Sequence, residues 1–434
     1  MVRDVVRILA SRVSWKKTTS LQTKVENPKE PQCILFIENS IGLSGSTISL
    51  CNLVAHLNRE LYIPYVVFSR NEQQEYFLNY FDPSVSTTVI QCRESLKFSR
   101  LSQRILSFID NRFPLLKRSF FSLLSLFDVL FVIFPYTFRL YAFAREKNIT
   151  LVHHNNGFDI AAIILAAVLG IPLIAYQRGN EWDSFLVRRL SKLVCSYIAN
   201  SEVTKENLLS IGIPDDKIAV IYPPVDFTKF DYCIDSSAQR KEFNIRDDEP
   251  CFGIVGTLLE WKGHRVFLRA AKTVIHSVPG ARAFIIGSVP DGNDTYRQEL
   301  INLARDLGIA DRVVFTGFRS DIPGLVQAMN VIVHTSITPE PFGRVIIEAM
   351  AMKKPVIASL AGGPIEIIRD QYNGFLVPVG DAEQLAGRII QLLQDRALAE
   401  RIGYNAYHNA KERFSIPSHM QMVQDIYTRV QRGT

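Results

Sequence analysis

Residues 338–368 read TPEPFGRVIIEAMAMKKPVIASLAGGPIEII and carry the most informative pattern in the chain. The pattern predicts a proline-stiffened loop, a helix over 344–352 with one apolar side, a short buried strand, a Gly-Gly turn and a second helix start. Elements in this order place ligands at the carboxyl ends of parallel strands. The free N–H groups of the helix that follows Gly343 offer an anion site. Two carboxylates in such a site, Glu340 and Glu348, suit the hydroxyl groups of a ribose and a hexose better than a phosphate.

This stretch resembles the donor-sugar motif of the retaining glycosyltransferases of family 4, which have the GT-B fold. The likeness lies in the Glu–seven–Glu spacing of Glu340 and Glu348, the Pro-Phe-Gly between them, the Glu-Ala-Met-Ala run, and the Gly-Gly-x-x-Glu that ends at Glu366. An ordinary βα unit with two solvated glutamates is the alternative, and the presence of every element in order disfavours it. The resemblance implies an α/β protein with two facing, Rossmann-like, doubly wound domains and a cleft between them.

The resemblance also implies a role for each matching residue of this stretch. Glu340 would accept hydrogen bonds from the transferred hexose, and Glu348 from the ribose of the nucleotide. Phe342 and Gly343 would offer backbone groups to the sugar and the phosphate. Arg344 would add positive charge near the diphosphate.

A second part of the donor site is expected after the buried strand that ends on Gly256. The resembled family carries Gly-Arg at this strand end and Lys-Gly further on, and both cations bind the donor pyrophosphate. Gly256, Lys262 and Gly263 match this pattern, whereas Thr257 replaces the arginine. A solvated surface lysine is the alternative for Lys262. If two cations bind the donor pyrophosphate in this chain as well, the second comes from elsewhere in the sequence. The candidates are Arg344, Arg319 and Arg178.

Two further strand ends complete the expected donor site. Gly287 ends its strand where a phosphate or sugar would approach. Phe318 and Arg319 follow the next strand, where members of the family place backbone groups around the nucleotide base.

The N-terminal half contains a strand, a glycine loop and a helix start, which form the first ligand loop of a doubly wound domain. This loop has neither the Walker lysine nor the full dinucleotide fingerprint. The resemblance implies that Gly45 lines the cleft from the acceptor side. His154 fits the place of a strand-end histidine near the transferred sugar, with an ordinary polar strand-end histidine as the alternative. Many relatives carry a second histidine where this chain has Arg178, which we expect to contact a phosphate or the acceptor.

An almost wholly apolar run covers residues 119–143, but Asp128 stands in its middle and Pro135 near its end. A transmembrane span needs about 20 apolar residues, and a central Asp costs roughly 2.5–3.5 kcal/mol on insertion scales. We therefore rank an interfacial element on the membrane first, a buried core helix second and a true span last.

The chain of 434 residues is too long for a single core and suits two domains. Its net charge of +6 is modest and uneven. No recognisable nucleic-acid-binding module accompanies the basic residues, so we expect an anionic membrane surface as the partner and no nucleic acid. The basic residues gather in two places: Arg3, Arg7, Arg12, Lys16 and Lys17, and then Lys97, Arg100, Arg104, Arg112, Lys117 and Arg118.

The six cysteines are scattered, with no Cys-x-x-Cys and no metal-ligand spacing. This usage favours a reducing compartment. The basic N-terminus lacks the apolar core and cleavage site of a secretory signal. We expect a cytoplasmic protein associated with the inner face of the membrane.

The expected domain boundaries follow from these patterns. Residues 1–32 form a basic extension, either an amphipathic helix on a membrane or a frayed segment without function. Residues 33–222 form the acceptor-side domain, 223–248 the linker, and 249–415 the nucleotide-sugar domain. Residues 416–434 form a helix that crosses back to the first domain.

The reaction implied by the resemblance is transfer of a sugar from a nucleotide diphosphate sugar to an acceptor hydroxyl, with retention. Its catalytic residues would be His154, Glu340 and Lys262, and its acceptor a polysaccharide or a lipid-linked sugar. No Asp-x-Asp stands at a strand end, so we expect no metal and no cofactor beyond the donor. A nucleotide-sugar epimerase of the same architecture and a catalytically silent nucleotide-sugar-binding subunit remain as alternatives.

Overall fold

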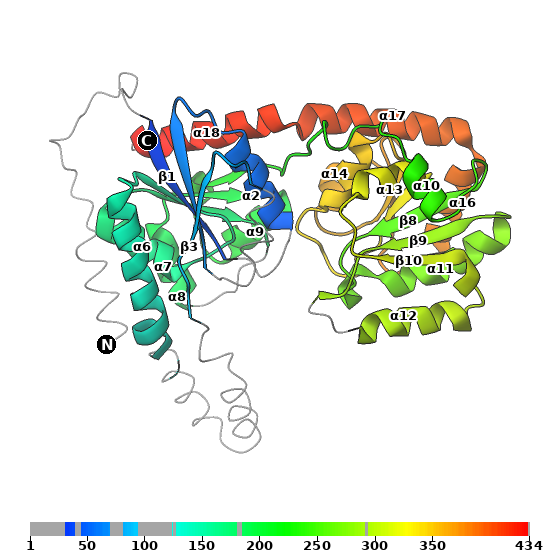
Figure 1. Ribbon diagram of the computed structural model, residues 1–434, viewed down its shortest axis with the longest axis horizontal. Coiled ribbons are helices and arrows are strands. Elements are labelled where there is room, and N and C mark those ends of the chain that lie inside the picture. Colours follow the sequence, from blue (N-terminus) through cyan, green and yellow to red (C-terminus); the bar gives the residue numbers. More distant parts are fainter. Residues whose placement is uncertain are drawn as a thin grey trace, which may run out of the picture. The chain divides into compact units, whose positions relative to one another are not determined.

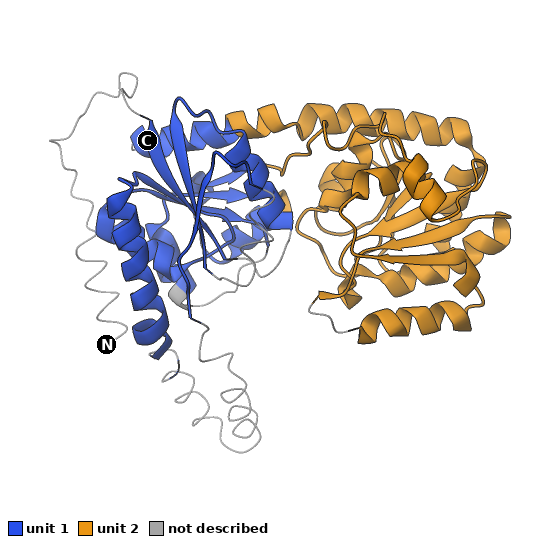
Figure 2. Ribbon diagram, viewed as in Figure 1, with its two compact units in different colours: residues 1–199, 204–220, 422–434 blue, residues 200–203, 221–421 orange. Residues whose placement is uncertain are grey.

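The computed structural model describes residues 31–39, 45–69, 81–93, 124, 127–179, 185–290 and 294–432 (Figure 1). The chain divides into two compact units (Figure 2). Unit 1 comprises residues 1–199, 204–220 and 422–434, and unit 2 comprises residues 200–203 and 221–421. Residues 1–30 of the predicted basic extension lie outside the described residues.

The described residues of unit 1 form a seven-stranded parallel sheet in the order β3-β2-β1-β4-β5-β6-β7. Strands β1, β2 and β5 are mostly apolar, as expected where helices cover both faces of a parallel sheet. The strand order reverses between β1 and β4, and ligands of doubly wound sheets bind outside the carboxyl ends at such a point. The strands are β1 (Gln32–Glu38), β2 (Tyr62–Phe68), β3 (Ser86–Val89), β4 (Leu151–His154), β5 (Leu173–Gln177), β6 (Ser196–Ala199) and β7 (Ile218–Val220).

The helices of unit 1 pack on this sheet through their apolar sides. Helix α7 begins at the N-cap residue Asp159, whose carboxylate accepts from the N–H of Ala162, and ends at Gly170 with a left-handed φ of 67°. Helix α6 packs along α7 (Figure 1). The bounds are α2 (Gly45–Ala55), η2 (Val129–Ile133), α6 (Phe134–Glu146), α7 (Ile160–Leu169), α8 (Phe185–Leu190), η3 (Ser191–Leu193), α9 (Glu202–Ser210) and η4 (Asp215–Lys217).

The described residues of unit 2 form a six-stranded parallel sheet in the order β10-β9-β8-β11-β12-β13. The order reverses between β8 and β11, so the carboxyl ends of these two strands mark the expected ligand position. Alternate residues face opposite sides: Ile285 packs in one apolar core and its neighbour Phe284 in the other. The strands are β8 (Cys251–Val255), β9 (Arg282–Ile286), β10 (Val313–Gly317), β11 (Val331–His334), β12 (Val356–Ser359) and β13 (Phe375–Val377).

The helices of unit 2 cover both faces of its sheet (Figure 1). They are α10 (Ser237–Glu242), η5 (Glu260–Lys262), α11 (His264–Ser277), α12 (Thr295–Asp306), η7 (Ala310–Arg312), α13 (Ile322–Ala328), α14 (Arg344–Ala351), α15 (Pro364–Ile367), α16 (Ala382–Gln394) and α17 (Arg396–Arg413). Helix α18 (Ile416–Arg432) begins in unit 2, and its residues from Met422 onward belong to unit 1.

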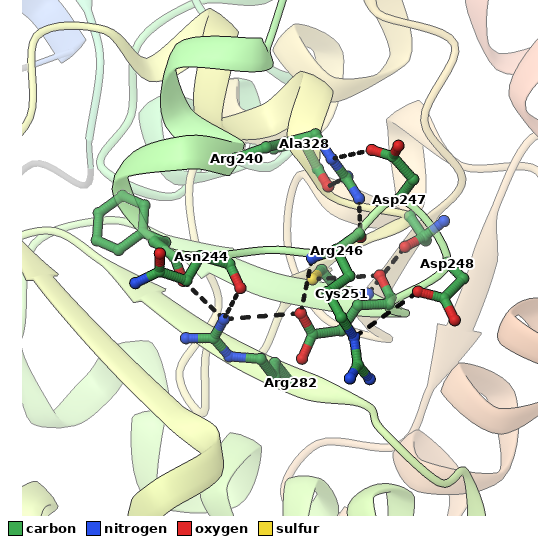
Figure 3. A network of polar contacts seen from close by, with 11 residues as sticks. Arg240, Asn244, Arg246, Asp247, Asp248, Cys251, Arg282 and Ala328 are labelled. Atoms are coloured by element: carbon green, nitrogen blue, oxygen red, sulfur yellow. Dashed lines mark hydrogen bonds and ion pairs between the residues drawn. The ribbon is translucent and has the colours of Figure 1, made fainter.

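The residues expected to form a linker, 223–248, lie within unit 2 and contain α10. Three of their apolar side chains are buried in a core of unit 2: Val225, Phe230 and Ile245. Figure 3 shows the polar contacts that fix the end of this segment. Nη1 of Arg282, on β9, donates to the carbonyl of Phe243 at 2.8 Å, and Arg240 donates to the carbonyl of Arg246. The segment is therefore packed on the unit that follows it.

The described part of the apolar run, residue 124 and residues 127–143, forms η2 and most of α6. One side of this helix is in the core of unit 1, where Tyr136 and Leu140 are buried, and the other side exposes large apolar residues. Among the described residues, no helix is both long and apolar enough to cross a membrane.

Candidate functional site

The side chain of Glu340 lies at the centre of a polar cluster at the carboxyl ends of β8 and β11. Its Oε1 accepts from Nζ of Lys262 at 2.7 Å. Its Oε2 accepts from Nε2 of His334 at 2.6 Å and from the hydroxyl of Ser336 at 2.9 Å. Because a carboxylate only accepts, Nε2 of His334 carries a proton. Both oxygens of Glu340 thus accept hydrogen bonds from residues at or after the ends of β8 and β11.

These hydrogen-bond partners keep the carboxyl group of Glu340 ionised. Burial acts to raise the pKa of this carboxyl, but the charge and hydrogen bond of His334, followed by those of Lys262, outweigh burial and hold the pKa well below its usual range. The side chain is only 15% exposed. Glu340 is therefore a fixed anion, suited to accepting hydrogen bonds rather than to acting as a general acid.

Close backbone packing holds the loop of Glu340 and the loop of Lys262. The N–H of Gly363 donates to the carbonyl of Glu340 at 2.8 Å, so the Gly-Gly turn anchors the glutamate. Gly263 has a φ of 74°, and a Cβ at this position would lie 1.9 Å from the carbonyl oxygen of Thr335. The hydroxyl of Thr335 in turn donates to the carbonyl of Lys262 at 2.9 Å. Only glycine allows β11 and the lysine turn to approach this closely.

The ammonium group of Lys262 is positioned by the short turn η5. Its Nζ lies 4.2 Å from the centroid of the Trp261 ring, on which it makes a cation–π contact. The Lys262 side chain is 19% exposed. A cation held between an aromatic face and a carboxylate, and still open to solvent, can bind an anionic ligand without a large rearrangement.

Helix α14 brings a second charged pair close in sequence to this cluster. Gly343 precedes its first residue, and Nη2 of Arg344 donates to Oε1 of Glu348 at 2.9 Å, one turn further on. Phe342 is 3% exposed and stacks on Tyr222, with ring centroids 5.7 Å apart. Its side chain serves the core, so only its backbone groups are available to a ligand.

The remaining predicted donor residues follow the strand ends of unit 2. Gly256 follows β8 and Gly287 follows β9, where a Cβ on Gly287 would lie 2.0 Å from the carbonyl oxygen of Gly256. Phe318 follows β10 and is 56% exposed, and its place near a nucleotide base stays a prediction. Thr257, in place of the family's arginine, follows Gly256 directly.

Arg319 is held by two carboxylates. Its guanidinium binds Glu242 of α10 through Nη1 and Nη2, at 2.6 and 2.7 Å, and Asp321 through Nε and Nη2, at 2.8 Å each. The hydrogen bond from Arg319 lowers the pKa of Asp321 to about 2. This side chain ties the α10 segment to the sheet. Its contribution to nucleotide binding stays a prediction.

In unit 1, Arg178 lies in a polar chain at the carboxyl ends of β1, β4 and β5. Its Nη2 donates to Oδ1 of Asn155 at 2.8 Å, and its guanidinium lies 3.7 Å from the centroid of the Tyr176 ring. The amide of Asn155 donates to Oε2 of Glu38 at 2.5 Å and to the carbonyl of Ser46 at 3.2 Å. Asn155 is fully buried. It therefore fixes the orientation of Arg178 relative to the first turn of α2.

His154 is in a neighbouring cluster at the same edge of the sheet. Its Nδ1 donates to the carbonyl of Gly157 at 3.0 Å, so Nε2 is the acceptor of the hydrogen bond from the amide of Asn39 at 3.1 Å. Asn39 also donates to the carboxylate of Asp159 at 2.5 Å. The His154 side chain is 2% exposed. Gly45 is the exposed first residue of α2.

The structure brings some predicted residues together and adds others that the sequence reasoning missed. Lys262 and Glu340 are bonded directly, and Arg344 pairs with Glu348. His334, Ser336, Asn155 and Glu38 were missed. Each of these stands at or just after a strand end, and that position was the available signal.

Within the described ranges, no group of three or more His, Cys, Asp or Glu side chains could hold a metal ion. That no metal is required stays a prediction.

Two family models match consecutive parts of the chain. "Glycosyltransferase Family 4" matches residues 44–229 and "Glycosyl transferases group 1" matches residues 235–409. Together they cover most of both sheets and the whole Lys262–Glu340 cluster, whereas β1, Glu38 and Asn39 lie before the first matched residue. The chain belongs to glycosyltransferase family 4.

Two curated relatives show how far the likeness to other members of family 4 extends. The lipopolysaccharide core biosynthesis glycosyltransferase LpsE of Rhizobium meliloti is 32% identical over 179 residues, which are 41% of this chain and 50% of the relative. An Escherichia coli UDP-Gal:alpha-D-GlcNAc-diphosphoundecaprenol alpha-1,3-galactosyltransferase is 24% identical over 66% of this chain and 77% of the relative. The chain spans about half the length of the first curated relatives it matches.

A solved structure shows the fold of this family 4 chain. The crystal structure of Anabaena HepE in complex with UDP and glucose matches with a TM-score of 0.73 at 24% identity, over 91% of this chain and 99% of HepE. The fold is GT-B, with two Rossmann-like parallel α/β units, as predicted from the sequence.

Proposed function

We propose that this chain transfers a sugar from a nucleoside diphosphate donor to an acceptor hydroxyl with retention of the anomeric configuration. The observation that carries the proposal is the Lys262–Glu340 pair at the point of strand reversal in unit 2. It supplies one cation for a diphosphate and one fixed anion for sugar hydroxyls in the same cluster. Membership of family 4 supports the same reaction.

The donor is a UDP-sugar in this proposal, because HepE, the structural relative, was solved with UDP, with UDP and glucose, and with UDP-glucose. Lys262, Arg344 and the N–H groups at the start of α14 stabilise the negative charge that develops on the leaving diphosphate. Glu348 accepts hydrogen bonds from the ribose. Glu340 accepts from the hexose once Lys262 has turned from its carboxylate to the diphosphate.

The chemical step follows from the state of the two carboxylates in the donor motif. Glu340 and Glu348 each accept a hydrogen bond from a cation, so neither is a free nucleophile. The bond between the anomeric carbon and the diphosphate oxygen breaks, and its electron pair leaves with the diphosphate. The acceptor hydroxyl attacks from the same face, and its proton passes to the departing phosphate oxygen. An isolable sugar–enzyme adduct would contradict this step.

The acceptor is a polysaccharide or a lipid-linked sugar in cell-surface assembly. The relatives LpsE and the galactosyltransferase named after a diphosphoundecaprenol acceptor support this class. Arg178, fixed by Asn155, would contact an acceptor phosphate. The six free cysteines fit work on the cytoplasmic side of the membrane.

The test is release of nucleoside diphosphate from a panel of UDP-, GDP- and ADP-sugars, with and without a crude membrane lipid fraction. Release from a UDP-sugar that is stimulated by lipid and lost in Glu348→Ala supports the proposal. The matched control is Glu400→Ala, which removes the glutamate of another i,i+4 Arg–Glu pair, on the exposed face of α17, and should leave release unchanged.

Two outcomes would favour other functions. Conversion of the donor sugar with nothing added would indicate a nucleotide-sugar epimerase. Weak nucleotide binding without turnover, with every donor and lipid fraction, would indicate a silent binding subunit.

A further inference from the structure

Helices η2 and α6 of unit 1 present a row of large apolar side chains to solvent. Their exposed fractions are 40% for Phe127, 44% for Leu130, 52% for Phe131, 46% for Phe134 and 71% for Phe138. Spacings of three, four and seven residues place them on one side of the helix. The rings of Phe127 and Phe131 stack, with centroids 5.6 Å apart. These five residues are called the phenylalanine face below.

The opposite side of the same helix is fixed in the folded unit. Tyr136, Leu140 and Ala144 are at most 3% exposed and pack in the core against α7. The phenylalanine face is therefore a rigid surface of the unit. A core helix has no need of five exposed aromatic and aliphatic side chains, because their exposure costs solubility without adding packing.

Two polar residues of the run, Asp128 and Thr137, are turned away from the phenylalanine face. Asp128 is 4% exposed, and the hydroxyl of Thr137 donates to the carbonyl of Ile133 at 2.8 Å. The carboxylate that argues against insertion of this run into a membrane is thus buried in protein.

The backbone departs from a regular α-helix within the apolar face. The segment 129–133 is π-helical, and Pro135, which has no amide N–H, stands where α6 begins. A π turn holds more residues than an α turn, and here the neighbours Leu130 and Phe131 are both exposed. Because a π turn rotates less per residue than an α turn, these two neighbours lie closer to one side of the helix.

Cations follow the phenylalanine face at the C-terminal end of α6. Arg139 and Arg145 are exposed, and Arg145 falls seven residues after Phe138, on the same side of the helix. Lys147 lies just beyond, paired with Glu146, the one exposed carboxylate of residues 127–147. Arg145 also lines a surface cavity of about 370 Å³, together with Asn148 and Thr150. An apolar row that continues into exposed cations matches the acyl and phosphate layers of an anionic lipid surface.

We propose that the phenylalanine face docks this chain on an anionic bilayer, with α6 lying in the interface and its basic end at the headgroup phosphates. The occupant is lipid rather than a protein because the face offers no polar group of its own within the apolar row. The docking does not depend on sugar transfer, so it is measured without a donor.

The test is co-sedimentation of the full chain with vesicles of phosphatidylcholine that contain roughly one third phosphatidylglycerol. The triple variant Phe131→Ser/Phe134→Ser/Phe138→Ser should weaken binding by about tenfold or more, because it removes most of the inserted apolar area. Arg139→Gln/Arg145→Gln should weaken binding to the anionic vesicles and reduce the dependence of that binding on salt.

The matched control is Leu209→Ser/Val379→Ser/Tyr404→Ser, which removes three exposed apolar side chains elsewhere and should bind like the wild type. Phe138→Trp provides a second readout at an exposed position, since its added fluorescence should be quenched by brominated lipid. Unchanged vesicle binding of the phenylalanine triple, or an unquenched signal from the introduced tryptophan, would overturn the proposal. The proposal would also be overturned if the wild-type chain did not bind vesicles and instead formed a dimer that the triple variant does not form.

Discussion

Lys262 and Glu340, 78 residues apart in the sequence, are joined by an ion pair with an Nζ–Oε1 distance of 2.7 Å. The pair links the cation expected to bind a diphosphate to the anion expected to bind a sugar. Each group neutralises the other while no donor is bound. We expect a bound nucleotide sugar to compete for both groups and to lengthen or break this ion pair.

Glu340→Gln tests this relationship. The amide cannot accept from Lys262, His334 and Ser336 together, so we expect a loss of roughly 1–3 kcal/mol in the free energy of unfolding. Lys262 is then no longer held by a carboxylate. Affinity for UDP alone should rise severalfold, while sugar transfer falls by about 100-fold or more. Calorimetry with UDP and a donor-turnover assay measure the two effects, and weaker UDP binding in this variant would contradict the relationship.

Gly263→Ala tests the close packing that positions Lys262. The added Cβ would lie 1.9 Å from the carbonyl oxygen of Thr335, at a φ of 74° that alanine disfavours. We expect a loss of roughly 2–4 kcal/mol in the free energy of unfolding. The control is Gly387→Ala on α16, where nothing lies within 4 Å of the new Cβ, and which should be neutral or stabilising by up to about 1 kcal/mol. Denaturant unfolding of both variants measures the difference. Equal unfolding midpoints for the two variants would mean that the backbone next to Lys262 adjusts to the added Cβ without a loss of stability.

Arg178→Lys tests the polar chain of unit 1, provided that the proposed reaction holds. Lysine cannot reproduce both bonds to Asn155 and the stacking on Tyr176. We expect kcat/KM for a phosphate-bearing lipid acceptor to fall by about tenfold or more, with a smaller change for a neutral sugar acceptor. Asn155→Leu should imitate this selective loss, because it removes the side-chain oxygen that accepts from Nε and Nη2 of Arg178 and leaves only the backbone carbonyl. An equal loss for both acceptors would assign Arg178 a structural role only.

The fold could be predicted because its signals are local. Short apolar runs with helical patterns between them indicate parallel sheets, and the short buried strand predicted within residues 338–368 is β12 (Val356–Ser359). The segment 223–248 was expected to be a linker because it lacks a period. Its packing on unit 2 depends on contacts such as Arg282 to Phe243, which no local pattern reveals.

The site could be predicted only as far as its motif extends. Glu340, Lys262 and Glu348 belong to the resembled pattern, whereas the pairing of Glu340 with Lys262 and His334 requires two strand ends to meet. For Arg319 the sequence suggests a nucleotide contact, which stays a prediction. Its guanidinium is bound by Glu242 on α10, a partner that the sequence did not indicate. That partner is contributed by a segment for which no fixed position was expected.

We expect His264, the first residue of α11, to make the stability of unit 2 depend on pH. Its side chain is fully buried, and burial lowers its pKa from 6.5 to about 4. The unfolded chain therefore takes up a proton at this residue as the pH falls, before the folded chain does.

The stability that depends on neutral His264 is fully present above pH 6.5 and decreases as the pH falls toward 4, by up to about 3 kcal/mol. Denaturant unfolding of the wild type and of His264→Phe at pH values between about 7 and 5 measures this effect, because the other histidines are common to both chains and Glu340 affects stability only below the ordinary carboxyl pKa. His264→Phe should flatten the profile, whereas His276→Gln, an exposed histidine on the same helix, should leave it unchanged. Parallel profiles for wild type and His264→Phe would show that this histidine is not the titrating group.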